Sequence, residues 1–476
     1  MSSILKQVLL LSPLWSLSVM AFIPLTAKLL NNNKELKREV VCFIYALNLL
    51  TSLALFFVFG FNNKEAFSLH FDAYSSASCV LVGLSALISL ALIYLNSWLD
   101  KRHLTEILFF FSQGVLALYV FCLAQDLMTA FIGIETASLI LYINLAMSRK
   151  ELLCLESAIK YFVLSALSSV VFLYGLSFLF GATGTLELNQ FFTEQNESFV
   201  YNRFFFLGFC LIFASLFFKV ALFPFQFWLA DVYQGALTPL TLFMATGIKS
   251  SVVLFLGKLF ALPFFEKSEH GFVFLTGLAT ASVLTVLFGN IMALNQQKWK
   301  RLVAFSSLAH SGYLMMALFG ILNVTSSSKD FSILFYYLLA YIFLTGGLLT
   351  AAQCLEKQSS QTELKDSQSL FKRNPLLAFA FSLFLLGLAG MPPTFGFFAK
   401  VGIFQSLISS GSWWLLFWAF AGSAIGLYYY IKPISLMLNS EEKQEPLFLP
   451  GLAKFVLILL MFFSLFGAFL FGRFFY

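Results

Sequence analysis

Between Phe217 and Phe255 the chain places two lysines, Lys219 and Lys249, inside segments long and apolar enough to cross a bilayer. A lysine at the middle of a bilayer costs about 2.5–3.5 kcal/mol on insertion scales. Pro224 lies between them and breaks a helix, because it removes a backbone donor. Broken helices persist at membrane depth only where protein or a water-filled cavity satisfies the freed backbone groups. These features predict the lining of a polar pathway, and so an ion or proton translocator.

The composition is that of a polytopic membrane protein. Of the 476 residues, 60% are hydrophobic and 11% are charged, and the mean hydropathy is +0.87. Soluble domains carry about 25% charged residues, so an ordinary soluble fold is excluded. The net charge of +6 therefore predicts no nucleic-acid partner. Membrane lipid is the expected surrounding.

No cofactor or metal site is expected in this chain. None of the six cysteines belongs to a C-x-x-C pair, so their spacing indicates neither an iron–sulfur cluster nor a zinc site. The sequence also has no glycine motif of the kind that cradles phosphate. Buried apolar positions are expected for the cysteines, which are Cys42, Cys79, Cys122, Cys154, Cys210 and Cys354.

We predict an all-α polytopic membrane protein with about fourteen transmembrane helices. The apolar run after Lys6 has no clear small-residue cleavage site, so it is interpreted as a retained first span. Residues 224–237 belong to a broken seventh helix or lie at the surface. The expected spans are residues 8–30, 39–61, 76–97, 105–123, 127–147, 156–180, 204–223, 238–261, 271–293, 302–321, 331–352, 375–410 with a break, 412–431 and 455–473.

Positive charges alternate between the two sides of these spans. The odd-numbered connections hold 17 Lys and Arg residues, whereas the opposite side holds seven and five lysines lie within spans. By the positive-inside rule the odd-numbered connections face the cytoplasm and both termini face outward. No connection is large enough for a soluble catalytic domain, and residues 353–374 are expected to form a solvated loop with a short surface helix.

Proline breaks and intramembrane lysines occur together twice. The segment KVALFPF carries Lys219, and the later segment GMPPTFGFFAK carries Pro392, Pro393 and Lys400. Paired interrupted helices are typical of inverted-repeat transporters. Lys249 likewise follows a proline, Pro239, at which a further helix break is expected. The pattern suggests two related halves, although the identity between them is slight.

Glu135 lies near the centre of the fifth span. A buried carboxylate needs a partner or a proton, and Lys219 is the partner that we expect. An opposite charge favours the protonated amine and burial disfavours it, so a lysine between these two influences can be switched. The alternative is a static ion pair between helices.

Three lysines are expected to carry protons, namely Lys219, Lys249 and Lys400. Snorkelling to an interface suits Lys28, which lies near the end of its span, but it does not suit these three. A buried lysine that gives up its proton readily can both accept and release one, so a chain of them can pass a proton through water.

His310 is the only one of the four histidines inside an expected span. Hydroxyl side chains surround it in the sequence, at Ser306, Ser307, Ser311 and Tyr313. This setting favours an imidazole that relays protons. The alternative is a histidine that is hydrogen-bonded within the core and carries no proton.

Other charges lie close to span ends. Glu156 and Lys160 are spaced i,i+4 in the favourable order, and either a structural pair or a secondary proton path is compatible with that spacing. Solvated or capping roles are expected for Asp126 and Asp231.

Four long segments resemble the antiporter-like membrane subunits of proton-pumping NADH:quinone oxidoreductase, respiratory complex I. They are FKVALFPFQFWLADVYQGALTPLTLFMATGIKS, GNIMALNQQKWKRLVAFSSLAHSGYLMMALFG, SAIKYFVLSALSSVVFLYGLSFLFGATGTLEL and LAGMPPTFGFFAKVGIF. The resemblance covers residues 105–432, and it is strongest to the N-type subunit. Lysine at position 400 favours the N-type over the M-type, which tends to carry glutamate there. The L-type carries a long C-terminal extension, which this sequence lacks beyond Tyr476.

The resemblance implies a proton path through residues already selected by their position in the membrane. In the family, a glutamate on the fifth helix and lysines on the seventh, eighth and broken twelfth helices form the path, which here implies Glu135, Lys219, Lys249 and Lys400. His310 matches the family's histidine on the tenth helix, a connector between half-channels. Leu237 replaces the proline or small residue common in the family, a minor change in a loop.

The resemblance also implies an organisation in two inverted five-helix repeats. The expected divisions are residues 1–104 for helices 1–3, 105–262 for the first repeat, 263–431 for the second and 432–476 for helix 14. Flavin, iron–sulfur clusters and quinone are expected in partner subunits, with M-type and K-type neighbours, in a bacterial inner membrane. The alternatives are a subunit of a multi-subunit cation/proton antiporter, a subunit of a membrane-bound hydrogenase or a related formate- or ferredoxin-oxidising complex, and a structural spacer.

Overall fold

The computed structural model describes most of the chain, and the structure is discussed for those residues only. They are residues 10–30, 37–60, 64–66, 68–96, 103–148, 152–191, 203–262, 265, 269–324, 329–356, 362–439 and 446–475. Lys6 and the first residues of the first expected span lie outside them. The chain forms two compact units, which are described separately. Unit 1 comprises Met1–Lys219 with Ser250–His270, and unit 2 comprises Val220–Lys249 with Gly271–Tyr476.

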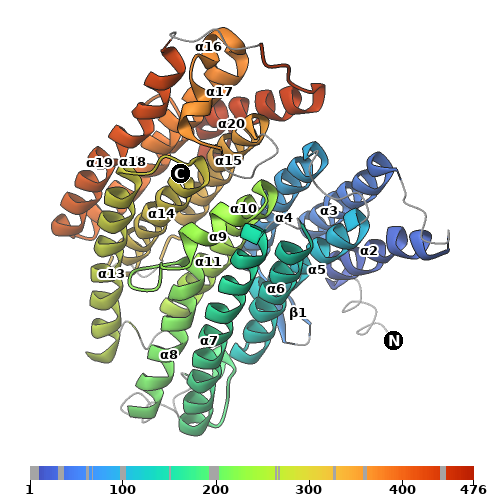
Figure 1. Ribbon diagram of the computed structural model, residues 1–476. Helices are drawn as coiled ribbons and strands as arrows, with labels where there is room; N and C mark the ends of the chain where they lie inside the picture. Colours follow the sequence, from blue (N-terminus) through green and yellow to red (C-terminus); the bar gives the residue numbers. More distant parts are fainter. Residues whose placement is uncertain are drawn as a thin grey trace. The chain divides into compact units, whose positions relative to one another are not determined.

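Unit 1 consists of long apolar helices and one short hairpin. Neighbouring helices pack in pairs, for example α5 on α6 and α2 on α3 (Figure 1). The strands β1 and β2 form an antiparallel hairpin in the connection that the sequence left irregular. The elements are α2 (Ser12–Leu30), α3 (Arg38–Phe59), β1 (Lys64–Ala66), β2 (Leu69–Phe71), α4 (Ala73–Leu95), α5 (Leu104–Leu123), α6 (Leu127–Ser148), α7 (Leu152–Thr183), the 3₁₀ turn η2 (Leu188–Gln190) and α8 (Arg203–Val220).

Unit 2 is built around two almost fully buried helices, α14 and α15. Helix α18 packs on α14, and both α17 and α20 pack on α15. The elements from residue 229 onward are α9 (Leu229–Gly235), α10 (Thr238–Phe243), the π-helical turn η4 (Met244–Ile248), α11 (Lys249–Phe260), α13 (Glu269–Leu294), α14 (Trp299–Leu322), α15 (Ser332–Leu355), the 3₁₀ turn η5 (Leu364–Ser367), α16 (Leu370–Arg373), α17 (Pro375–Ala389), α18 (Phe395–Ser409), α19 (Trp413–Leu438) and α20 (Gly451–Phe475). Helix α11 belongs to unit 1 from Ser250 onward.

The described residues contain 13 helices that are long and apolar enough to cross a membrane. Helices α17 and α18 are shorter and together form the broken twelfth span that the sequence predicts. The all-α membrane architecture is therefore confirmed. Some helices run past the expected boundaries: α7 covers Leu152–Thr183 and α19 ends at Leu438, because a helix continues beyond the apolar core of a bilayer. Residues 362–373, where a solvated loop with one short surface helix was expected, contain the 3₁₀ turn η5 and the one-turn helix α16.

Both predicted breaks occur, each at a residue in the left-handed backbone region. Helix α8 ends at Val220, and Ala221 follows with φ 61°, three residues before Pro224. Helix α17 ends at Ala389, and Gly390 follows with φ 84° before the two prolines. Each break therefore begins earlier than its prolines. The prediction that Pro239 is a break is wrong, because this proline lies in the first turn of α10, where its missing N–H costs nothing.

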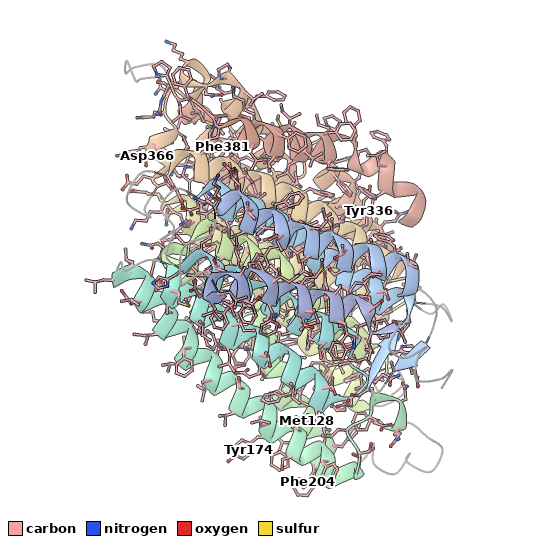
Figure 2. All side chains as sticks on the ribbon, turned by 90° about the vertical axis from the view of Figure 1, so that its right-hand side faces the viewer. Met128, Tyr174, Phe204, Tyr336, Asp366 and Phe381 are labelled. Atoms are coloured by element: carbon pink, nitrogen blue, oxygen red, sulfur yellow. The ribbon has the colours of Figure 1, made fainter. Side chains whose placement is uncertain are left out.

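Apolar side chains cover the outer faces of several helices. In the most apolar 18-residue stretch of α7, 39% of the residues are buried, whereas in the corresponding stretch of the helical run Thr238–Phe260 all of them are buried. Figure 2 labels three of the exposed side chains, Met128 of α6, Tyr174 of α7 and Phe204 of α8. Large exposed apolar faces of this kind fit contact with lipid. The buried run Thr238–Phe260 carries Lys249, and the buried helix α14 carries His310.

Candidate functional site

Glu135 and Lys219 are brought together in unit 1, as the sequence predicts. Glu135 lies on α6 and Lys219 lies in the last turn of α8, two residues before the break begins at Ala221. The Lys219 Nζ is 3.6 Å from the Glu135 Oε2, and the lysine side chain is 2% exposed. At that distance the pair is electrostatic and is not closed by a short direct hydrogen bond.

Serine hydroxyls form hydrogen bonds with both charged groups. The Lys219 ammonium donates to the Ser138 Oγ at 2.7 Å and to the Ser165 Oγ at 2.6 Å. The Ser169 hydroxyl donates to the Glu135 carboxylate. Sequence reasoning missed these serines, although Ser138 follows Glu135 by three residues and so shares its helix face. Each hydroxyl both donates and accepts, so the shell around Lys219 is able to pass a proton.

Lys249 is held in unit 2 without a carboxylate. It lies at the start of α11, directly after the π-helical turn η4. Its ammonium donates to the Ser307 carbonyl oxygen at 2.6 Å and to the hydroxyl of the same residue, and it lies 5.9 Å from the centre of the Tyr341 ring. Among the residues that the structure describes, no carboxylate forms an ion pair with it. A buried charge held only by neutral oxygens and an aromatic face is poorly compensated.

His310 is fixed through both ring nitrogens, but not by the hydroxyls that its sequence neighbourhood suggests. Its Nδ1 lies 2.6 Å from the Tyr337 hydroxyl of α15, and its Nε2 lies 3.2 Å from the Tyr430 hydroxyl of α19. The three serine hydroxyls bond elsewhere, because serines on a helix turn back to carbonyls of their own helix or reach another neighbour, and the centre of the Tyr313 ring lies 6.1 Å from the centre of the imidazole ring. Ser311, for example, donates to the Ser307 carbonyl at 3.0 Å. The imidazole is therefore one member of a tyrosine–histidine–tyrosine line.

Lys400 lies on α18, the second half of the broken span. Its ammonium donates to the carbonyl oxygen of Ala389 at 2.8 Å and to the Ser423 Oγ at 3.1 Å. Ala389 is the last residue of α17, so the lysine occupies the negative end of a helix dipole. The ring centre of Tyr313 lies 5.3 Å from the ammonium.

A small cavity lies next to both His310 and Lys400. Its volume is ≈ 10 Å³, which is room for about one water molecule. Tyr337 and Tyr341 are among its other lining residues. The polar groups around it are the ones a bridging water would need, so the histidine and the lysine are positioned to exchange a proton through this space.

The secondary charges take simpler positions. Glu156 and Lys160 form an i,i+4 pair of 2.7 Å whose side chains are 56% and 43% exposed, so they lie on the outer face of α7, away from the Lys219 shell. Asp126 caps α6 by accepting from the Thr129 backbone N–H at 2.7 Å, and this expected role is confirmed. Asp231 pairs with Arg301 at 2.9 Å.

Lys28 does not snorkel to an interface, and that expectation is wrong. It is buried and forms a 2.7 Å ion pair with Glu106. The reason is packing: α2 lies on α5, and Glu106 is in the first turn of α5. Four of the six cysteines are buried, as expected, while Cys210 and Cys354 are half-buried.

Comparison with known proteins gives a consistent picture. Residues 124–426 match the family described as NADH:quinone oxidoreductase/Mrp antiporter, TM. The chain is 36% identical over 445 residues to NADH-quinone oxidoreductase subunit N of Bdellovibrio bacteriovorus, covering 93% of this chain and 91% of the relative. It is 31% identical over 382 residues to subunit N of Nitrosomonas europaea, covering 79% and 77%.

Two solved structures share the fold. A chain of respiratory complex I from Thermus thermophilus matches with a TM-score of 0.81 at 28% identity, over 97% of both chains. A chain of the Mrp complex from Dietzia matches with a TM-score of 0.82 at 17% identity, over 98% of this chain and 95% of that one. The second likeness is one of fold alone. The antiporter-like architecture is therefore shared across complexes of different composition.

Proposed function

Because the chain belongs to the NADH:quinone oxidoreductase/Mrp antiporter family, and within it to subunit N, we propose that Glu135, Lys219, Lys249, His310 and Lys400 relay protons across the membrane. The energy comes from quinone reduction in neighbouring subunits. The observation that carries this proposal is the burial of three lysines, each held by hydroxyl or carbonyl oxygens at or beside an interruption of its helix. Static helix contacts do not require such poorly compensated charges.

The relay begins at Glu135 and Lys219. A change in the Glu135–Lys219 separation alters how strongly the carboxylate holds the proton on the amine. When the carboxylate withdraws, Lys219 releases its proton to the serine hydroxyls and onward toward Lys249. Ser138 and Ser165 are the first acceptors, since both already accept from the ammonium.

The second part of the relay runs within unit 2. Lys249 passes the proton to His310, whose two ring nitrogens allow it to accept on one side while it donates on the other. Lys400 then accepts it across the small cavity and releases it outward. Lys400 binds the proton well as long as its ammonium contacts the C-terminal end of α17, because the carbonyl end of a helix stabilises a cation.

We also propose surroundings for the chain, and its family membership supports them. We propose that it is a multi-pass subunit of a bacterial cytoplasmic membrane, with both termini outward and the odd-numbered connections cytoplasmic. M-type and K-type subunits are its proposed neighbours. Flavin, iron–sulfur clusters and quinone act in partner subunits, and this chain supplies no redox site of its own. Glu156 and Lys160 are a proposed secondary path at the outer face.

The function is tested by purifying the tagged protein from its native membrane in mild detergent and recording absorption and EPR spectra of the assembly. We expect flavin and iron–sulfur signals together with NADH:quinone activity. Nickel signals would instead indicate a hydrogenase. An assembly of colourless membrane subunits with sodium-dependent transport would contradict the proposal in favour of a cation/proton antiporter.

A further inference from the structure

A second buried ion pair lies in unit 2, at residues that sequence reasoning placed in solvated connections. The Lys300 Nζ is 2.8 Å from the Glu356 Oε1, and the two side chains are 4% and 2% exposed. Lys300 lies in the first turn of α14, and Glu356 directly follows the last residue of α15. The pair therefore lies where α14 begins and α15 ends, and both side chains are almost fully buried.

Four helix ends meet at this pair. The Lys300 ammonium also donates to the Ala236 carbonyl oxygen at 2.9 Å, at the end of α9. The Thr238 hydroxyl, at the start of α10, donates to the Glu356 carboxylate. The other carboxylate oxygen, Oε2, is buried and accepts no hydrogen bond from any residue that the structure describes.

This arrangement is a costly way to fasten helices. Removing two charges from water costs more free energy than their mutual attraction regains unless every polar atom is hydrogen-bonded. Apolar residues of similar size often give the same stability. A buried carboxylate oxygen without a hydrogen bond adds a further penalty. A free oxygen on a sealed carboxylate is, however, what a proton needs in order to bind. The geometry thus favours a proton-binding role.

Two helices lead from the pair to Lys249. On α14, Lys300, Ala304 and Ser307 follow one another at intervals of four and three residues, so they share one face of the helix. Ser307 is the residue that holds the Lys249 ammonium. Seven residues of helix separate Lys300 from Ser307, a rise of about 10 Å. Thr238 begins the helical run that leads through η4 to Lys249, the first residue of α11.

We propose that Lys300 and Glu356 form a proton inlet of unit 2, which loads Lys249 from the side on which α14 begins. This inference rests on the relay proposed above. A proton from water binds the free oxygen of Glu356, giving a neutral acid beside the ammonium. Lys300 then passes one proton inward to the neutral amine of Lys249. The acid proton of Glu356 moves to Lys300, which restores the original pair, so that one proton has moved inward.

The test is Glu356→Gln in the complete complex, reconstituted into vesicles, with protons counted per electron pair. Glutamine keeps an oxygen for Lys300 and Thr238 but takes up no proton. We expect pumping to fall toward the value of Lys249→Met, since Lys219 still supplies Lys249, and we expect the double variant to pump no less than Lys249→Met alone. Asp231→Asn is the matched control, because it neutralises the partner of Arg301, next to Lys300, and leaves pumping unchanged.

Lys300→Arg gives an independent result if Glu356→Gln does not assemble. Arginine keeps the charge and the pair but does not release a proton. An inlet predicts the same loss of pumping, whereas a merely structural pair predicts pumping like the wild type. The inlet is overturned if Lys300→Arg or assembled Glu356→Gln pumps normally while Lys249→Met pumps less. That result does not contradict the relay. Normal pumping in Lys249→Met as well overturns both.

Discussion

The three central lysines differ in what compensates their charge. Lys219 has a carboxylate at 3.6 Å as well as two serine hydroxyls. Lys249 and Lys400 have carbonyl and hydroxyl oxygens and an aromatic ring, with no ion pair among the described residues. A direct, fully closed ion pair would hold its proton firmly. Shells of neutral oxygens stabilise the charge less and leave acceptors in place for the proton, which suits a relay.

The hydroxyl shell of Lys219 makes a prediction for Ser138→Ala combined with Ser165→Ala. A hydrogen bond to a charged group contributes about 1.5–3 kcal/mol, and about 1.4 kcal/mol is a factor of ten in rate. We expect proton transfer through Lys219 to slow by about tenfold or more, measured as NADH-driven acidification of vesicles. Ser168→Ala is the control, because Ser168 bonds to Ser215 at 2.8 Å. An equal loss of proton transfer in the double variant and in Ser168→Ala would contradict a specific role for the hydroxyls that bond to Lys219.

At this scale the sequence predicts which charges are buried but not all of their partners. The proximity of Glu135 to Lys219 was predictable, because a charge buried inside a membrane is stabilised by a partner of opposite charge. The partners of His310 were not, because Tyr337 and Tyr430 lie on other helices and local sequence does not report on them. Lys300 was misplaced for a related reason: a charge at a span end looks solvated unless its distant partner, Glu356, is known.

At the scale of elements, the interruptions place the charges. Lys219 lies in the last turn of α8, before the break, and Lys249 immediately follows η4. Lys400 lies on α18 and reaches back to the carbonyl end of α17. Prolines in the sequence predicted two interruptions. The π-helical turn was not predictable from a proline, because it depends on packing in the surrounding helices rather than on a missing donor.

Gly390 ends α17 in a conformation that favours glycine, which predicts the effect of Gly390→Ala. The left-handed backbone costs a side chain about 1–2 kcal/mol, and an added Cβ would lie 2.6 Å from the Lys400 Cδ. We therefore expect lower thermal stability and reduced proton pumping. Gly184→Ala is the control, because Gly184 also has a positive φ but has nothing within 4 Å of the added Cβ. Gly184→Ala should lower the thermal stability without changing proton pumping. Reduced pumping in this control would contradict the argument.

For the whole molecule, hydropathy was enough to predict the class and most of the spans, because each span must bury its own backbone hydrogen bonds. Hydropathy did not predict the hairpin β1–β2, since its strands are only three residues long. The division of the chain into repeats at residues 105–262 and 263–431 stays a prediction. The same holds for the orientation of the termini.

The central claim is that this chain carries protons through its buried lysines, and counting protons per electron pair in reconstituted complexes that carry Lys219→Ala or Lys400→Ala tests it most directly. Quinone reduction should persist with an uncoupler present, while fewer protons are moved in each variant. Lys258→Ala is the control, because Lys258 also lies on α11 but donates to the Ala124 carbonyl at 2.6 Å, outside the relay. An unchanged proton count in both relay variants would contradict the account.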